Sequence, residues 1–493
     1  MGRITFISIF TIVLLLTLQL QSCRDDDFNT SPSLKLEFST DSVLFDTVFT
    51  SVGSSTRLFK IYNKHNSRIN ISAIEVASGS SSYFRVNVDG RSGNQFQNIE
   101  IGPRDSLFVF VEVTVDPQNV DLPLIISDSL MIHVNNNVQN VKLIAWGQDA
   151  HFIRPNAIDT SSGITFHLLD QNTTWSGPKP YVVYGLVLVA PGVTLQVTEG
   201  TNVHFHNQSG MIFLGQSSFK VQGNLEQPVT FQGDRLESGY KNLPGQWGYI
   251  WLTATSRNHE IDYAIIKNAT YGIIMDSIGS TTEPTLRIRN TIIKNMDQVG
   301  FDSRGSYVKA ENLVVANCGL HAIYLGLGGN YDFRHTTIAN YYWLNIRQSP
   351  SVVFNNYYVD TMGVVHVREF DKLYFGNSIL SGSLMEEIEL DLYPGPEVAN
   401  FLFENSQVKT QLAQQNSMHR ELFLESIFTS QVHFVDTREN DYRLKEISPA
   451  IGMGNPEISA QIPYDILGNS RLERVDIGAY QYFEIEEEEE QEE

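Results

Sequence analysis

The segment Ile265-Ile266-Lys267-Asn268 recurs along the chain as Ile292-Ile293-Lys294-Asn295, Val314-Val315-Ala316-Asn317 and Thr337-Ile338-Ala339-Asn340. Two weaker copies, Tyr358-Val359-Asp360-Thr361 and Ile379-Leu380-Ser381-Gly382, each follow 21 residues further on. The asparagines of the first four copies lie 27, 22 and 23 residues apart. A repeat that contains helices would need a run of roughly 10 residues with a 3.6-residue period, and none occurs between the copies. The repeat therefore predicts a solenoid built from short parallel strands.

Aligning the copies produces columns of like residues. The first column is aliphatic throughout and contains Ile266, Ile293, Val315, Ile338, Val359 and Leu380. The second column is also apolar and contains Ile273, Phe301, Ile323, Ile346, Val367 and Ile388. Parallel strands of adjacent coils lie about 4.8 Å apart, so like residues stack and fill one continuous interior. We expect these two columns to form the core of an all-β stack.

Two further columns are polar and are expected to have structural roles. The third column contains Tyr263, Asn290, Asn312, His335, Asn356 and Asn377. Asparagine tolerates tight-turn backbones and can hydrogen-bond along a ladder. The fourth column alternates in charge as Asp262, Arg289, Glu311 and Arg334, followed by Asn355. Opposite charges at strand spacing stabilise a sheet, so the fourth column predicts a surface ionic ladder rather than a pair of catalytic acids.

One outward stripe is the best candidate for ligand binding. It reads Ile274, Asp302, Tyr324, Arg347, Arg368 and Glu389, and His366 lies two residues before Arg368. Because Arg347 and Arg368 are 21 residues apart, we expect them to stack on neighbouring coils. Two adjacent guanidinium groups can bind the uronate or sulfate groups of an acidic glycan. In the alternative interpretation this is a mixed surface stripe, in which Asp302 and Glu389 offset the arginines.

Aromatic residues form a second candidate surface. Tyr341, Tyr342 and Trp343 follow Asn340 directly, at a predicted turn. Exposed aromatic side chains suit sugar surfaces because one end is apolar and the other can hydrogen-bond, so these three are predicted to contact neutral glycans. Trp247 and Trp251 flank a strand and are expected to be packing residues. No metal or cofactor site is predicted, because no set of histidine, cysteine and acidic residues has ligand spacing.

Residues 34–150 are predicted to form a separate β-sandwich. About seven short runs alternate apolar and polar residues, for example Arg57-Leu58-Phe59-Lys60-Ile61-Tyr62, with turn clusters between them. The pattern resembles immunoglobulin-like modules that precede bacterial surface domains. Such a module would space or support the next part of the chain.

From Tyr181 onwards the chain resembles right-handed parallel β-helix proteins of the pectin-lyase-like type. The resemblance rests on the repeat and on Pro244-Gly245-Gln246-Trp247-Gly248. It rests also on a C-terminal signature that includes Ser448-Pro449-Ala450-Ile451-Gly452 and Asp476-Ile477-Gly478-Ala479-Tyr480. It implies a connector at residues 151–180, the β-helix at 181–440, a cap at 441–482 and an acidic tail at 483–493. Polysaccharide lyases and glycoside hydrolases share this fold with non-catalytic proteins, so the fold does not decide the activity. The repeats contain no Asp-Asp pair of the hydrolase type, and the acidic doublet near them is Glu386-Glu387.

The N-terminus is predicted to be a targeting segment. Residues 1–22 combine Arg3 with an apolar run, and Leu20-Gln21-Ser22-Cys23 follows. This resembles the lipobox of bacterial lipoproteins, which implies cleavage before Cys23 and attachment of lipid to its sulfur. Arg24-Asp25-Asp26-Asp27, within a linker at residues 23–33, is similar to the export signal of Bacteroidota surface lipoproteins. The alternatives are a plain signal peptide or a short transmembrane anchor.

Composition limits the remaining possibilities. The 493 residues include 34 Lys and Arg against 56 Asp and Glu, a net charge of −22, which argues against nucleic acid as a partner. With only two cysteines, a disulfide scaffold is excluded. The leading hypothesis is a non-catalytic outer-membrane lipoprotein, exposed at the surface and held by its lipid, that binds a polysaccharide or another envelope component. The alternatives are an enzyme acting on acidic glycan and a structural or adhesive spacer.

Overall fold

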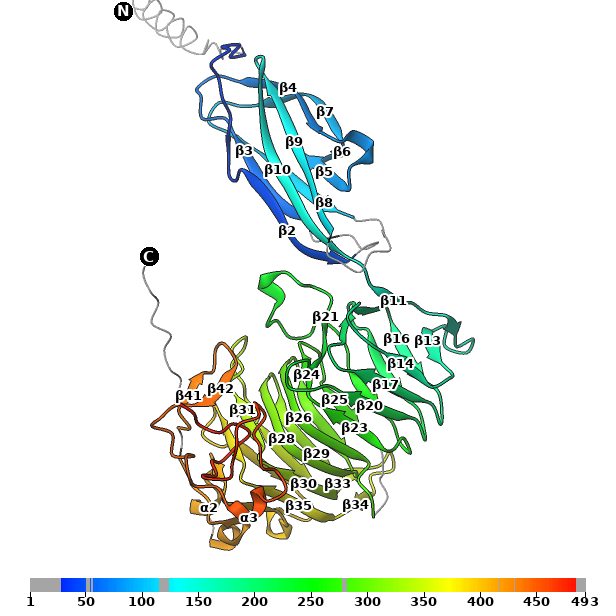
Figure 1. Ribbon diagram of the computed structural model, residues 1–493, viewed down its shortest axis with the longest axis vertical. Helices are drawn as coiled ribbons and strands as arrows, with labels where there is room; N and C mark the ends of the chain where they lie inside the picture. The colour runs from blue at the N-terminus through cyan, green and yellow to red at the C-terminus, as the bar shows by residue number, and fades with distance from the viewer. Residues whose placement is uncertain are drawn as a thin grey trace, which may run out of the picture. The chain divides into compact units, whose positions relative to one another are not determined.

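The computed structural model describes residues 28–49, 54, 56–114, 124–276, 282–415, 417–429 and 431–484. The predicted signal segment, Cys23 and residues 485–493 of the acidic tail lie outside the described residues. The chain divides into two compact units, Met1–Asp149 and Ala150–Glu493, and each is described separately (Figure 1). In the described ranges, no helix is long and apolar enough to cross a membrane.

The first unit is a sandwich of two five-stranded sheets, as predicted. One sheet has the order β1 (Glu37–Phe38), β3 (Arg57–Tyr62), β8 (Ser106–Val113), β5 (Phe84–Val88) and β6 (Arg91–Gly93). The other has the order β2 (Ser42–Phe49), β10 (Asn137–Gln148), β9 (Leu124–Val134), β4 (Ile69–Val76) and β7 (Gln95–Ile101). The short turn η1 (Gly79–Ser81) precedes β5. Strand β8 buries alternate residues, so one face of its sheet packs into the core and the other faces solvent.

The second unit is a parallel β-helix whose strands form two long sheets. The ten-stranded sheet contains β12 (Ala157–Ile158), β13 (Thr165–Leu169), β16 (Leu186–Val189), β19 (Gly210–Phe213), β22 (Ile250–Leu252), β25 (Ile273–Met275), β27 (Val299–Arg304), β29 (His321–Gly326), β32 (Val352–Asn355) and β37 (Ile388–Asp391). Its pairs are parallel from β13 onwards. Each coil contributes one strand to this sheet, and the connections between coils have the right-handed sense expected of parallel strands.

The 18-stranded sheet supplies the other two sides of each coil. Its first side contains β14 (Thr173–Trp175), β17 (Thr194–Thr198), β20 (Ser218–Gln222), β23 (His259–Asp262), the first half of β26 (Leu286–Met296), the first half of β28 (Tyr307–Cys318), β30 (Gly329–Arg334), β35 (Phe370–Gly376), β38 (Leu402–Glu404) and β40 (Phe423–Leu424). Its second side contains β11 (His151–Ile153), β15 (Tyr181–Val183), β18 (Asn202–Phe205), β21 (Val229–Gly233), β24 (Ala264–Lys267), the second halves of β26 and β28, β31 (Thr337–Asn340), β36 (Ile379–Gly382) and β39 (Gln407–Val408). The chain bends between the two sides at each coil.

The predicted asparagine column is the bend between these two sides. Tyr263, Asn290, Asn312, His335 and Asn377 all have left-handed backbones, with φ between 47° and 50°. Asparagine adopts this conformation more readily than most residues. The Asn312 side chain donates to Asn290 Oδ1 at 2.9 Å, so the predicted ladder is present. The core prediction is also confirmed over this region, because Ile266, Ile293, Val315, Ile338 and Leu380 are register partners and all are buried.

The weak copy at residues 358–361 is not a coil, and this prediction was wrong. Ile338 pairs directly with Leu380, so one coil spans 42 residues. Part of that coil leaves the stack as an antiparallel hairpin of β33 (Tyr357–Val359) and β34 (Val365–Val367). Val359 is consequently 54% exposed instead of lying in the core.

The same misplaced copy displaced other residues in the predicted columns. In the second column Val352 takes the place assigned to Ile346, because Ile323 pairs with Val352 and Val352 with Ile388. Ile346 is 91% exposed, and Val367 lies in the hairpin. Asn355 is in the ten-stranded sheet and follows Phe354 there, so it does not extend the ionic column. Gly376 occupies that position beside Arg334.

Two segments cover the stack at its C-terminal end. The turn η3 (Pro396–Val398), the short helix α2 (Leu412–Gln415) and the turn η4 (Ser417–Leu422) lie around the last strands, where Leu412 and Leu422 pack against the core. The C-terminal segment, residues 432–482, holds β41 (Phe434–Asp436), β42 (Asp441–Leu444) and α3 (Pro456–Ser459). It lies along the flank of the coils beside β28 and β31 (Figure 1). The turn η2 (Ser238–Tyr240) belongs to an earlier loop between β21 and β22.

Candidate functional site

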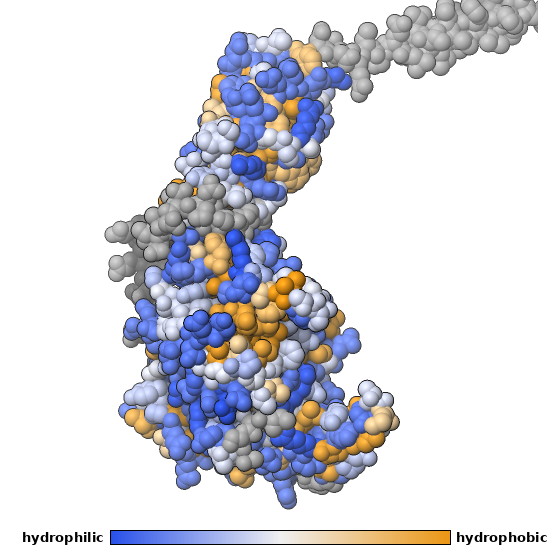
Figure 2. Space-filling view, turned by 90° about the vertical axis from the view of Figure 1, so that its right-hand side faces the viewer, coloured by the Kyte–Doolittle hydropathy of each residue, from blue (hydrophilic) through white to orange (hydrophobic). Residues whose placement is uncertain are grey.

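The outward row of the ten-stranded sheet changes from apolar to polar at β27. Successive register partners in this row are Leu168, Leu188, Ile212, Trp251, Ile274, Asp302, Tyr324, Val353 and Glu389. The residues from Leu168 to Ile274 are partly exposed, although their inward neighbours are fully buried. Figure 2 views the side on which Figure 1 places β13 and β16, and hydrophobic residues gather there on the second unit, with polar ones around them.

Five residues at this transition form the Asp302 cluster: Trp251, Asp276, Asp302, Arg304 and Tyr324. The Trp251 indole Nε1 donates to Asp276 Oδ2 at 2.8 Å. Arg304 lies between two carboxylates, donating from Nη2 to Asp302 Oδ2 at 2.7 Å and approaching Asp276 Oδ1 at 3.6 Å with Nη1. Tyr324 is the register partner of Asp302 on the next coil. Four adjacent strands, β22, β25, β27 and β29, therefore bring one indole, one phenol, two carboxyl groups and a guanidinium together.

The Asp302 carboxyl group is unusual because it is buried on an outward-facing position. Only 4% of the residue is exposed, and its Oδ1 atom has no hydrogen-bond partner among the described residues. Burial raises the pKa of Asp302, and Asp276 adds to the rise, while Arg304 opposes it. A carboxyl group in this state can accept a hydrogen bond from a hydroxyl group, or carry a proton and donate one.

A second polar group continues the cluster across the sheet. Asp391 Oδ1 accepts from the Tyr357 hydroxyl at 2.9 Å, and its Oδ2 accepts from Asn355 at 2.8 Å. Burial raises the pKa of Tyr324, and the charges of Asp302 and Asp391 raise it further. Tyr324 therefore lies within electrostatic range of both carboxyl groups, and a hydroxylated ligand on this face would meet three acids and one arginine.

Arg347 was predicted to lie on the exposed stripe, and the structure contradicts this. Tyr324 pairs with Val353, so Arg347 is not in the outward row. The Arg347 and Glu387 side chains are both fully buried, and Arg347 Nη2 donates to Glu387 Oε1 at 2.6 Å. Glu387 also accepts from the amide and hydroxyl of Ser351 at 3.0 and 2.6 Å. Arg347 is thus a structural residue that fixes the loop before β32, out of reach of a ligand.

Arg368 and His366 lie outside the row as well. Both are exposed, at the end of the hairpin formed by β33 and β34. His366 Nε2 contacts Asp360 Oδ2 at 2.8 Å, and its ring stacks on Tyr358 with centroids 4.7 Å apart. Arg347 and Arg368 therefore form no shared cationic surface, and the predicted site for acidic glycan is not assembled. Of the five residues proposed for that site, Asp302 and Tyr324 are neighbours.

The predicted aromatic surface is divided between the interior and the solvent. Tyr342 is buried, and the hydroxyl groups of Tyr341 and Ser381 are hydrogen-bonded at 2.7 Å. Trp343 is 56% exposed by itself. Trp247 is a packing residue as predicted, buried against the Phe205 ring with centroids 4.2 Å apart. Trp251, also predicted to pack, is partly exposed instead and belongs to the Asp302 cluster.

Sequence reasoning missed Asp276, Arg304 and Asp391. Asp276 follows β25, and Arg304 and Asp391 are the last residues of β27 and β37, two positions beyond the outward residue that the alignment examined. Aligning the residues two positions after Ile274, Asp302 and Glu389 would have found them. No group of three or more metal-ligating side chains occurs within the described ranges.

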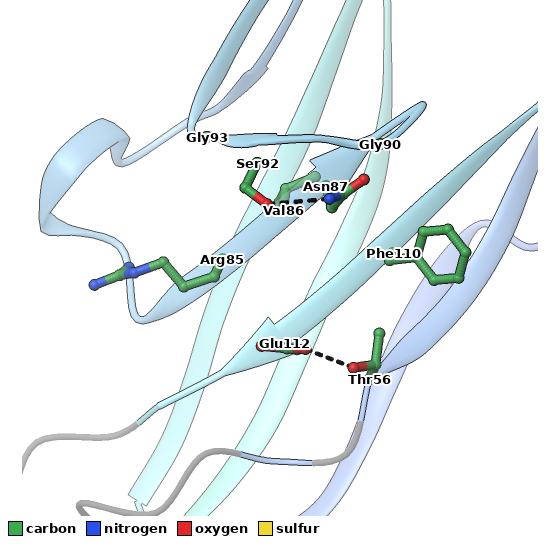
Figure 3. A pocket seen from close by; sticks show the side chains of 9 residues that line it. All are labelled: Thr56, Arg85, Val86, Asn87, Gly90, Ser92, Gly93, Phe110 and Glu112. Carbon is green, nitrogen blue, oxygen red and sulfur yellow. Dashed lines mark hydrogen bonds between the residues drawn. The ribbon is translucent and has the colours of Figure 1, made fainter.

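The first unit has a surface hollow of about 410 Å³ on the sheet of β3, β8 and β5 (Figure 3). Phe110 forms one wall, and polar side chains form the others. These polar groups bind each other, because Thr56 donates to Glu112 at 2.6 Å and Asn87 donates to Ser92 at 3.0 Å. Arg85 donates to backbone carbonyl groups of Ser82 and Phe84. The hollow thus combines one aromatic ring with polar groups that are already bonded.

No protein-family model matches the chain, and no curated protein matches it. Similarity to solved structures is weak. The ASH / PapD-like domain of human CEP192 is 14% identical, with 24% of this chain and 87% of that chain covered and a TM-score of 0.16. A family 123 glycoside hydrolase from Clostridium perfringens is 8% identical over 29% of this chain and 30% of that one, with a TM-score of 0.18. The catalytic domain of a GH87 α-1,3-glucanase is 10% identical over 71% and 80%, with a TM-score of 0.21. These similarities concern the fold alone.

Proposed function

We propose that this chain is a cell-envelope protein that binds glycan on the outward face of its ten-stranded sheet, at the Asp302 cluster. The observation that carries the proposal is the buried Asp302 carboxyl group, whose Oδ1 has no partner, between Arg304 and the rings of Trp251 and Tyr324. Sugar hydroxyl groups both donate and accept hydrogen bonds, so they suit neighbouring carboxyl and guanidinium groups. The apolar faces of a sugar ring suit the indole and the adjacent aliphatic row.

The charge of the face favours neutral glycan over acidic glycan. Asp276, Asp302, Asp391 and Glu389 lie on it, against the single guanidinium of Arg304. That guanidinium is already bound by two carboxylates, so a uronate or sulfate would meet mostly like charge. The proposed ligand is therefore an uncharged polysaccharide, which replaces the acidic glycan expected from the sequence.

Affinity electrophoresis of the purified full chain in gels containing laminarin, dextran, starch or galactan tests this proposal. Trp251→Ala should weaken retention by the bound polysaccharide at least about tenfold, as expected for loss of roughly 1.4 kcal/mol. Trp343→Ala is the matched control, because Trp343 is the more exposed tryptophan and lies in another part of the fold. If the wild type is retained by no neutral polysaccharide, or if both variants behave alike, the proposed site is wrong.

A second candidate function is cleavage of the bound glycan. It is favoured by the raised pKa of Asp302 beside Asp276, since glycoside hydrolysis uses one protonated and one ionised carboxyl group. Asp302 would donate the proton to the leaving oxygen, and Asp276 would activate water or stabilise positive charge on the sugar. Release of reducing ends, abolished by Asp302→Asn with binding retained, would support the enzyme. Binding without release at any pH between about 4 and 8 would leave the chain a binding protein.

Anchoring through Cys23 is part of the same proposal. It is supported by the Leu20-Gln21-Ser22-Cys23 sequence, since Cys23 lies outside the described residues. Two or more acyl chains hold a protein stably at a membrane, whereas one chain gives reversible binding. Cys23→Ser should abolish lipid labelling and membrane retention. A labelled, membrane-bound variant would contradict the lipoprotein interpretation without affecting the glycan site.

A further inference from the structure

Three lysines converge on the second side of the 18-stranded sheet, away from the Asp302 cluster. Lys267 ends β24, and its register partner in β26 is Lys294, so their backbones lie about 4.8 Å apart. The preceding residues, Ile266 and Ile293, point into the core and are fully buried. Side chains alternate along a strand, so both lysines point outward from the same sheet. Like charges at this spacing destabilise a sheet unless something compensates them.

The loop that contains η2 brings a third lysine to the pair. Asn268, directly after Lys267, donates to the Lys241 carbonyl at 3.0 Å, and Gln246 N donates back to the Asn268 carbonyl at 2.8 Å. Asn295, directly after Lys294, donates to Asn242 Oδ1 at 3.3 Å. The loop is therefore fastened to both lysine-bearing strands at once. It covers the lysines in part, so Lys267 and Lys294 are half-buried while Lys241 is exposed.

No carboxylate compensates these three charges. Across the described residues, none of the three ammonium groups makes a hydrogen bond or an ion pair. Other lysines of the same unit do: Lys220 Nζ lies 2.8 Å from Glu260, and Lys372 Nζ lies 2.7 Å from Asp332. The pKa of Lys294 falls to about 8 through burial and through repulsion by Lys267 and Lys241. Burial and repulsion by Lys241 lower the pKa of Lys267 as well.

We propose that Lys241, Lys267 and Lys294 bind one tetrahedral oxyanion, a phosphate or sulfate group, either free or esterified to a sugar. Each ammonium group has three N–H donors, and a phosphate or sulfate group has three or more acceptor oxygens at tetrahedral angles. Bound there, the anion would bridge the two strands and the η2 loop and remove the repulsion between the lysines. The site goes beyond the neutral-glycan site and does not depend on it, because the two lie on different sheets.

Isothermal titration calorimetry of the full chain tests the proposal, with inorganic phosphate, glucose 6-phosphate and glucose 6-sulfate titrated separately at pH 7 and constant ionic strength. The wild type should bind at least one of these probes at one site per chain. Lys294→Met should weaken that binding at least about tenfold. Lys220→Met is the matched control and should bind as the wild type does, because Lys220 is paired with Glu260.

A stability measurement keeps the test independent of folding defects in the variant. In chloride without the probes, Lys294→Met should melt at a higher temperature than the wild type, because a half-buried, unpaired charge is removed. Binding of both esters together with free phosphate would assign the site to the anion itself, and binding of esters alone would assign it to a modified sugar. Absence of binding by all three probes, or equal binding by wild type and Lys294→Met, would overturn the proposal.

Discussion

At the scale of single residues, Arg347 shows what spacing alone leaves undetermined. Its distance of 21 residues from Arg368 matches the repeat, and on that basis both were expected on one exposed stripe. The 42-residue coil between Ile338 and Leu380 removes the match, and the guanidinium instead enters the interior with Glu387. Nothing in the residue types distinguishes a buried arginine from an exposed one, because burial depends on whether a carboxylate lies within reach in space.

The buried pair leads to a prediction about stability. Arg347→Met should lower the free energy of unfolding by about 3–5 kcal/mol, because Glu387 would be left buried without a counter-charge. Arg368→Met, at an exposed position, should change it by no more than about 0.5 kcal/mol. Urea denaturation of the two variants measures the difference. Equal stability of the two would show that the Arg347–Glu387 pair does not form.

At the scale of the strand and its turn, the sequence was more informative. The asparagine column was predicted from residue type and spacing, and five of its six members have the left-handed backbone. Asn356 is the exception, since it lies at the base of the hairpin and binds the Tyr393 carbonyl. The signal was strong here because a left-handed bend is a local requirement, and asparagine satisfies it within one residue.

This ladder can be tested at Asn312, which donates to both Asn290 and the Tyr464 carbonyl. Asn312→Gly should lose the two hydrogen bonds and keep the backbone, costing about 0.5–1.5 kcal/mol for each bond. Asn312→Ala loses the same bonds and adds roughly 1–2 kcal/mol of backbone strain. Thermal unfolding should therefore rank the wild type above Gly and Gly above Ala. An alanine variant as stable as the glycine variant would contradict the left-handed bend.

The ionic column beside it is also present in register, and Arg289 lies 2.7 Å from Asp262. Arg289→Ala should cost no more than about 1 kcal/mol, because the Arg289 side chain is about half exposed. Arg289→Glu should cost more, since the new carboxylate would lie between Asp262 and Glu311, and burial already raises the pKa of Glu311. Differential scanning calorimetry compares the two. If both variants match the wild type, Arg289 does not stabilise the stack.

At the scale of the whole molecule, the repeat predicted the architecture but not the departures from it. The all-β class, the sandwich and the parallel coils follow from periodicity, which long-range packing reinforces at every strand. The hairpin at residues 357–367 was mistaken for a coil because alternating residues suit an antiparallel pair and a stacked strand equally well. The Asp302 cluster was half predicted, since its remaining members come from strand ends that only the register brings together.

The hairpin gives a prediction at this scale. Replacing residues 358–366 with an Asn-Gly turn should leave the β-helix folded, because Ile338 and Leu380 already pair without it. The same replacement of residues 342–350, a segment of equal length, should unfold part of the stack because it removes Arg347. Circular dichroism and limited proteolysis distinguish the two products. Comparable loss of structure in both would mean that the hairpin supports the coils.

The position of the C-terminal segment bears on how the molecule responds to mechanical force. Its residues bind the bends of successive coils: Asn312 donates to the Tyr464 carbonyl at 3.0 Å, the His335 ring contacts Ser459 Oγ at 2.7 Å, and Asn377 donates to the Asn455 carbonyl at 2.9 Å. These side contacts act in parallel with the strand hydrogen bonds of the same coils. Under tension along the stack, rupture should therefore begin in the coils before Asn312 and stop where the lateral ties start. A protein held at a cell surface would then lengthen under load in its N-terminal coils while its C-terminal half kept its shape.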